Sequence, residues 1–127
     1  MNKSNILKTF NNHFEEFVCD VLRVFPNDND IIACKEALMT MRKGNPKLII
    51  DVFKINVVNP YRDKIIKNDI SFFIDKQYNN DLYSENTCKI LEKINILREP
   101  IRNMESDDKN KVLKYMNNLL KLCDLYN

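Results

Sequence analysis

The chain contains one glycine, Gly44, among its 127 residues. β-Hairpins and loops that cradle phosphates need several glycines, because glycine adopts positive φ freely and lets the backbone approach a neighbour closely. Apolar residues instead recur at three- and four-residue spacings along nearly the whole chain, which is typical of amphipathic helices. The sequence therefore predicts an all-α fold, a compact single-domain bundle of about six or seven helices over residues 1–127.

Capping residues and prolines mark where the first helices should begin and end. Ser4 is the expected N-cap of the first helix, which Pro26 stops. Asp28 or Asp30 should cap the second helix, and Gly44 should close it in the left-handed C′ position.

The segment Leu48–Val58 is the most ambiguous part of the chain. Its sequence, LIIDVFKINVV, is rich enough in β-branched residues to form a strand. We expect a helix instead, because apolar residues follow helical spacing there and no partner strand is evident. Asn45 and Pro46, as N-cap and first-turn proline, should begin this helix.

Two further boundaries are expected in the last third of the chain. Pro100 lies inside a helical pattern, so we expect a kink or a break near Arg98–Glu99. Ser106, followed by two aspartates, should be the N-cap of the final helix. The polar stretch 77–84 is typical of a loop. We expect one shared core, formed by Phe14, Phe17, Val21, Leu38, Leu91, Ile94, Met116 and Leu119.

Charge and cysteine content narrow the setting. Twenty basic and 18 acidic residues leave a net charge of +2, which is small for a protein that must bind nucleic acid. No uninterrupted apolar stretch of about 18 residues predicts a membrane span, and the N-terminal residues lack the apolar region of a signal peptide. We expect an intracellular protein that is not secreted. We expect all four cysteines to be reduced, unpaired thiols: Cys19, Cys34, Cys88 and Cys123.

No catalytic, cofactor or metal site emerges from the motifs. His13 is the only histidine, and Glu16 could orient it, but no nucleophile is implied nearby. The cysteines are far apart and form no C-x-x-C pair, so zinc ligands are missing. The sequence predicts neither an enzyme nor a cofactor.

Two basic clusters are the candidate contacts for a partner or a phosphate. Arg42, Lys43 and Lys47 surround a turn before a helix N-terminus, an arrangement that can hold a phosphate or an acidic partner. Local helix capping explains the same residues. The final helix carries a second cluster on one face, with the lysines Lys111, Lys114 and Lys121.

Five segments of the sequence together carry a resemblance to a known protein family. These are FNNHFEEFVCDVLRVFPNDNDI, MRKGNPKLII, DISFFIDKQYNNDL, LREPIRNM and KYMNNLLKL. In this order they resemble a family of small uncharacterised proteins from nucleocytoplasmic large DNA viruses, the mimivirus-like and algal-virus group. The resemblance implies expression in the cytoplasm of an infected host cell and packaging into virions, and it transfers no active-site residue. The excess of Asn, Lys and Ile, whose codons are rich in A and T, agrees with such a source.

We therefore expect a non-enzymatic viral interaction or structural protein that binds a viral protein or a second copy of itself. The alternative is a helical nucleic-acid-binding protein that uses the basic turn and the basic C-terminal helix.

Overall fold

The computed structural model describes residues 2–74 and 85–126, apart from the side chains of residues 85–88. Over this range the secondary structure is entirely helical, and no strand is formed. The elements are α1 (Lys3–Val24), α2 (Asn29–Gly44), α3 (Leu48–Phe53), the π-helical segment η1 (Lys54–Val58), α4 (Asn59–Ile66), α5 (Ser71–Ile74), α6 (Glu85–Arg102) and α7 (Ser106–Tyr126). No loop separates α3, η1 and α4, so the described chain forms six helical segments, although the non-helical backbone of Tyr61 (φ −122°, ψ 20°) kinks α4. The predicted all-α bundle is confirmed, whereas the predicted loop at 77–84 lies outside the described residues.

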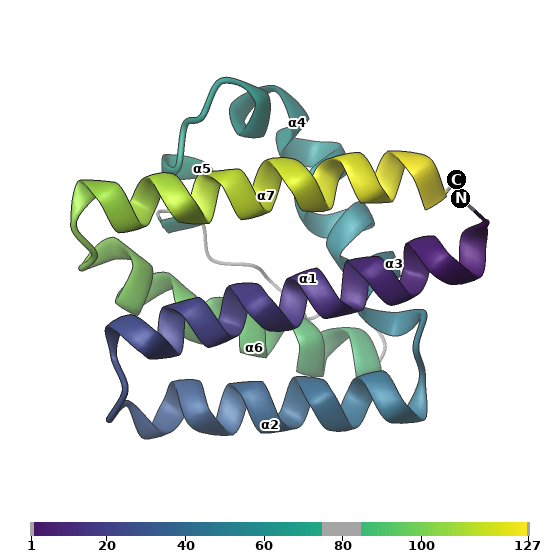
Figure 1. Cartoon of the computed structure of the whole chain (residues 1–127), viewed down its shortest axis with the longest axis horizontal. Coiled ribbons are helices and arrows are strands. Elements are labelled where there is room, and N and C mark those ends of the chain that lie inside the picture. The colour runs from purple at the N-terminus through teal and green to yellow at the C-terminus, as the bar shows by residue number, and fades with distance from the viewer. Residues whose placement is uncertain (1, 75–84, 127) are drawn as a thin grey trace.

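Helix α1 crosses the middle of the molecule between α2 and α7 (Figure 1). It packs most extensively against α7 and also contacts α2, α3 and α6. Helix α6 packs in turn against α2 and α3. No described helix combines the length and the apolar character needed to cross a membrane. The bundle is therefore organised around α1, which has neighbours on most of its circumference.

The core forms where the apolar stripes of these helices meet. All eight residues predicted for it are buried in one cluster, so that prediction is confirmed. Aromatic rings hold α1 and α3 together, because Phe14 meets Phe53 edge-on at 5.7 Å between ring centres and Phe10 meets Phe53 at 5.8 Å. Such edge-to-face pairs stabilise a core beyond the burial of their area.

The segment Leu48–Val58 is helical, as expected, and the strand alternative is wrong. Its second half has the wider π-helical turn, in which the N–H of Asn59 bonds to the carbonyl of Lys54, five residues back. The side-chain nitrogen of buried Asn56 donates to the carbonyl oxygen of Val52 at 3.0 Å. This bond supplies a polar partner inside an otherwise apolar stretch.

The predicted N-caps of the first two helices have different outcomes. Ser4 is not the cap of α1, because Asn2 precedes the helix and its side-chain oxygen accepts from the N–H of Asn5 at 2.8 Å. Asp28 caps α2 and accepts from the N–H groups of Asp30 and Ile31 at 2.9 and 3.2 Å. An Asn and a Ser are equally good caps, so residue type alone could not choose between two neighbouring candidates.

The left-handed helix end predicted at Gly44 is wrong. Gly44 is the last residue of α2 and has no positive φ, since the extended residue Asn45 ends the helix by donating to the carbonyl of Met41. The left-handed cap instead follows α4, where Asn68 has a φ of 59°. There the N–H groups of Asn68 and Asp69 bond back to carbonyls in the last turn of α4, which is a Schellman motif.

Three predicted boundaries in the rest of the chain are displaced. Helix α3 begins at Leu48 rather than at Asn45–Pro46, although the Asn45 side chain does accept from the N–H of Lys47 at 3.3 Å. The break expected near Arg98–Glu99 does not occur, since helix α6 continues through Pro100 to Arg102, whereas the kink expected as its alternative stays a prediction. Helix α7 begins at Ser106 itself, since the N–H of Lys109 bonds to the carbonyl of Glu105.

We expect Phe17→Ala to lower the free energy of unfolding by about 3–5 kcal/mol, because the ring is 1% exposed and its removal leaves a cavity among packed helices. Urea unfolding followed by circular dichroism measures the loss. Leu125→Ala is the matched control, since that side chain is 62% exposed and its loss should cost less than about 0.5 kcal/mol. Equal losses in the two variants would show that the α1 stripe is not a core element.

Three of the four cysteines have described side chains, and all three are free thiols. Cys34 and Cys123 are fully buried, whereas Cys19 is half-buried. Burial raises the pKa of the Cys34 thiol to about 12, against a smaller opposing effect of Lys93. Burial and then the Asp124 carboxylate raise the pKa of Cys123 to about 12.

We expect iodoacetamide at pH 8 to label Cys19 in the folded protein while Cys34 and Cys123 stay unlabelled. The thiolate is the reactive form, and a pKa of about 12 leaves about one thiol in ten thousand ionised at that pH. Mass spectrometry of the digested protein locates the label, and labelling in urea is the control in which all of these thiols react. Equal native labelling of the three would contradict the burial of Cys34 and Cys123.

Candidate functional site

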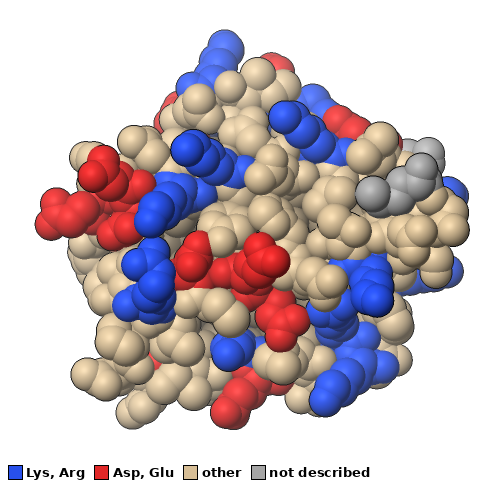
Figure 2. All heavy atoms as spheres, viewed as in Figure 1, with Lys and Arg blue, Asp and Glu red and all other residues tan. Residues whose placement is uncertain are grey.

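The structure separates the predicted basic residues into two groups on opposite sides of α1. Arg42 and Lys43 line a groove between α1 and α2, whereas Lys111 and Lys114 line a hollow between α1 and α7. Figure 2 shows acidic side chains across the middle of this face, over α1 in Figure 1, with basic side chains on both sides of them. Lys47 and Lys121 are exposed and line neither of these two depressions. The six cations therefore do not form one continuous track.

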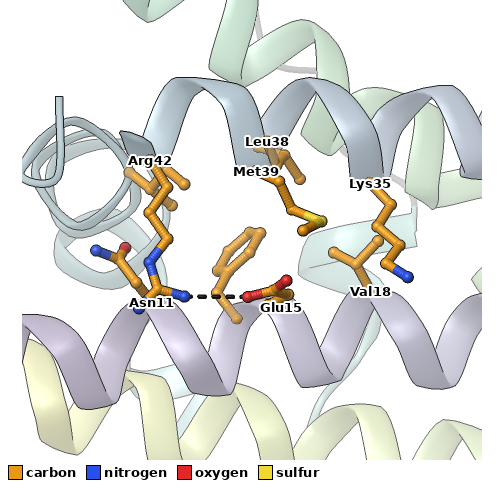
Figure 3. Close-up of a pocket in the computed structure, with 9 residues that line it drawn as sticks. Asn11, Glu15, Val18, Lys35, Leu38, Met39 and Arg42 are labelled. Carbon is orange, nitrogen blue, oxygen red and sulfur yellow. Dashed lines mark hydrogen bonds and ion pairs between the residues drawn. The ribbon is translucent and has the colours of Figure 1, made fainter. Parts of the chain in front are cut away.

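The depression between α1 and α2 will be called the α1–α2 groove. Its volume is about 590 Å³, and its lining residues are Ser4, Asn5, Leu7, Lys8, Asn11, Glu15, Met39, Arg42, Lys43 and Pro46. A smaller apolar hollow adjoins it, because Asn11, Glu15, Met39 and Arg42 line both (Figure 3). The groove thus combines an apolar floor with polar and charged edges.

An ion pair joins the two helices across this groove. The Nη1 atom of Arg42 lies 3.0 Å from the Oε2 atom of Glu15, and both side chains are about two-thirds or more buried, with exposed fractions of 25% and 31%. Figure 3 shows Arg42 descending from α2 to meet Glu15 on α1. The guanidinium that was predicted to contact a partner or a phosphate is therefore already engaged by a carboxylate. The sequence separation of 27 positions hid this pairing from sequence reasoning.

Asn11 is the residue of this groove that sequence reasoning missed. It is 3% exposed, and its Nδ2 atom donates to the carbonyl of Pro46 at 2.9 Å, which fixes the turn after α2 against α1. Its Oδ1 atom is buried and has no hydrogen-bond partner. The available signal was its position, since Asn11, Phe14 and Val18 share one face of α1 at helical spacing. A polar residue on an apolar stripe is unusual enough to single out.

The hollow between α1 and α7 has a volume of about 400 Å³ and gathers more ionisable groups. Its lining residues are His13, Glu16, Asp20, Arg23, Lys111, Lys114, Tyr115 and Asn118. The ring centres of His13 and Tyr115 are 4.8 Å apart, and the Nδ1 atom of His13 lies 3.7 Å from the Oε2 atom of Glu16.

The Tyr115 hydroxyl in this hollow donates to the carboxylate of Asp20. Burial and then this bond raise the pKa of Tyr115 above its ordinary value, so the hydroxyl stays protonated at neutral pH. The lining includes no serine, threonine or cysteine that could act as a nucleophile. Tyr115 and Asp20 are thus bound to each other, whereas the Nε2 atom of His13 is buried and has no hydrogen-bond partner. Within the described residues, no group of three or more His, Cys, Asp or Glu side chains is placed to hold a metal ion.

No protein-family model, curated protein or solved structure matches this chain. The resemblance to proteins of large DNA viruses therefore stays a prediction.

We expect a double-mutant cycle on Glu15→Gln and Arg42→Met to give a coupling of about 1 kcal/mol, because this ion pair is partly shielded from water. Thermal or urea unfolding of the two single variants and the double variant measures it. The pair Glu99–Arg102 is the matched control, with the same 3.0 Å separation but exposed fractions of 66% and 40%. Its coupling should be about 0.5 kcal/mol or less. A larger coupling in the control would contradict the structural role of Glu15–Arg42.

Proposed function

We propose that this chain is a non-enzymatic protein-interaction module. The observation that carries the proposal is the alternation of charge on the α1 face. Arg42 is paired with Glu15, and Arg23 lies 3.6 Å from Asp20. Lys111 and Lys114 share their hollow with two carboxylates. A surface of mixed charge complements another protein, whose surface is mixed as well, better than it complements a uniformly anionic polymer.

The content of the two depressions also supports a binding role rather than catalysis. General acid–base or nucleophilic chemistry requires a base within reach of a nucleophile or of substrate. In the α1–α7 hollow the lining residues include no nucleophile that His13 could activate, and the Tyr115 hydroxyl is bound to Asp20. The α1–α2 groove offers an amide, an ion pair and two exposed lysines, which are groups that recognise a ligand.

The cellular location and the partner that we propose follow from the sequence resemblance alone. We propose that the protein acts in the cytoplasm of a cell infected by a large DNA virus or inside the virus particle. Its partner would be a viral protein or a second copy of this chain.

A nucleic-acid binding measurement separates this function from its alternative. We expect the wild-type protein to bind duplex DNA and single-stranded RNA no better than a near-neutral control protein at physiological salt, because carboxylates intervene between its cations. Fluorescence anisotropy with labelled oligonucleotides measures the affinity. The triple variant Arg42→Ala, Lys43→Ala, Lys47→Ala should behave like the wild type.

The opposite result has a definite form. Phosphate contacts by this turn would be established by two results together. The wild type would bind with sub-micromolar affinity, and the slope of log affinity against log salt would be roughly two to three units shallower in the triple variant. The variant Lys111→Ala, Lys114→Ala, Lys121→Ala tests the last helix in the same way. Circular dichroism confirms that each variant is folded.

A further inference from the structure

Asn11 carries a hydrogen-bond acceptor that the protein itself does not use. The side chain is 3% exposed, its Nδ2 atom is bonded to the Pro46 carbonyl, and its Oδ1 atom has no partner. Buried polar atoms are nearly always paired, because a lone buried acceptor loses its hydration without compensation. An unused acceptor in the wall of a groove is therefore evidence for a ligand that donates to it.

The groove around Asn11 favours an anion. Its basic side chains, Lys8, Arg42 and Lys43, outnumber its single carboxylate, Glu15. Lys8 and Lys43 are exposed, so their ammonium groups can meet a ligand without leaving another site. The lining also contains Leu7 and Met39, which offer apolar contact.

These features together define the chemistry of the ligand. Asn11 Oδ1 only accepts, so it requires an N–H or O–H donor. A bare phosphate is anionic at neutral pH and presents acceptors, which suits the lysines but leaves the amide oxygen unpaired. A polypeptide that contains Asp or Glu supplies all three requirements: backbone N–H groups, carboxylates and apolar side chains.

We propose that the α1–α2 groove binds an extended acidic segment of a partner protein. One backbone N–H of the segment donates to Asn11 Oδ1, and its carboxylates lie against Lys8 and Lys43. This site deepens the proposed function and rests on it.

Arg42 controls access to the amide in this arrangement. The Oδ1 atom is shielded from solvent, and Arg42 passes beside Asn11 on its way to Glu15 (Figure 3). A carboxylate of the incoming segment competes with Glu15 for the guanidinium and draws it aside, so that the N–H can reach the oxygen. The ion pair described above thus acts as the cover of the site.

A phage-displayed library of random linear peptides, selected against the full chain, tests the proposal. We expect enrichment of peptides rich in Asp and Glu. The double variant Lys8→Ala, Lys43→Ala should weaken their binding about tenfold, as expected when two partly solvated charge pairs are lost. The matched control is Lys111→Ala, Lys114→Ala, which removes two exposed lysines from the other side of α1 and should leave the affinity unchanged.

A second measurement addresses Asn11 itself. Single N-methylation along a selected peptide should reveal one position where the wild-type protein loses about tenfold in affinity, because the donor to Oδ1 is removed. In Asn11→Leu the same methylation should have no effect. Circular dichroism checks that Asn11→Leu folds. If it does not fold, the N-methyl scan on the wild type and the binding of the lysine variants still test the site.

Several outcomes would overturn the site. They are failure to enrich any peptide, enrichment of neutral or basic peptides, equal binding to the Lys8–Lys43 variant, an N-methyl scan without a sensitive position, and displacement of the peptide by a DNA or RNA oligonucleotide at equal concentration.

These failures are distinguishable from failure of the proposed function. Affinity capture from infected cells after nuclease treatment tests the function directly. A protein partner that is retained equally by wild type and by Lys8→Ala, Lys43→Ala would keep the function and remove the site. Loss of every partner on nuclease treatment would overturn both.

Discussion

The packing of aromatic rings along α1 is the interaction on which the other features depend. Phe10, Phe14 and Phe17 of α1 are almost fully buried. The ring of Phe53 in α3 packs against the rings of Phe10 and Phe14. Helix α1 spans 22 residues, which is long enough to contact several neighbours at once. Helix α1 does so because its apolar stripe is wide enough to face α3, α6 and α7 together.

This central position also explains why both depressions flank the same helix. Successive residues of a helix point about 100° apart, so a helix that is packed on several sides places its remaining polar residues at the seams. Asn11 and Glu15, four residues apart, lie at the seam with α2, whereas His13 and Asp20 lie at the seam with α7. The carboxylates of α1 thereby separate the basic groups of its two neighbours. One helix defines both the core and the charge pattern of the surface.

The helices and the core were predictable from sequence because apolar spacing reports on burial directly. Even Leu48–Val58, with its β-branched composition, followed its spacing rather than its propensity. Details that depend on local competition were not predictable. Asn2 rather than Ser4 caps α1, and Asn68 rather than Gly44 takes the left-handed conformation, because several residues can perform either task and tertiary packing selects one. Contacts between distant positions, such as Glu15 with Arg42, left no trace in any local pattern.

The π-helical segment η1 has a consequence for how this sequence should be aligned with others. A π turn holds about one residue more than an α turn, so it absorbs an extra residue without changing the side that later side chains face. Removing one residue between Lys54 and Val58 would therefore restore an α-helix and leave the buried side chain of Ile65 in α4 facing the core. A relative with a purely α-helical segment here would be one residue shorter and would keep the apolar pattern of α4. Its alignment with this chain needs a single-residue gap at this turn, although no loop separates η1 from α3 or α4.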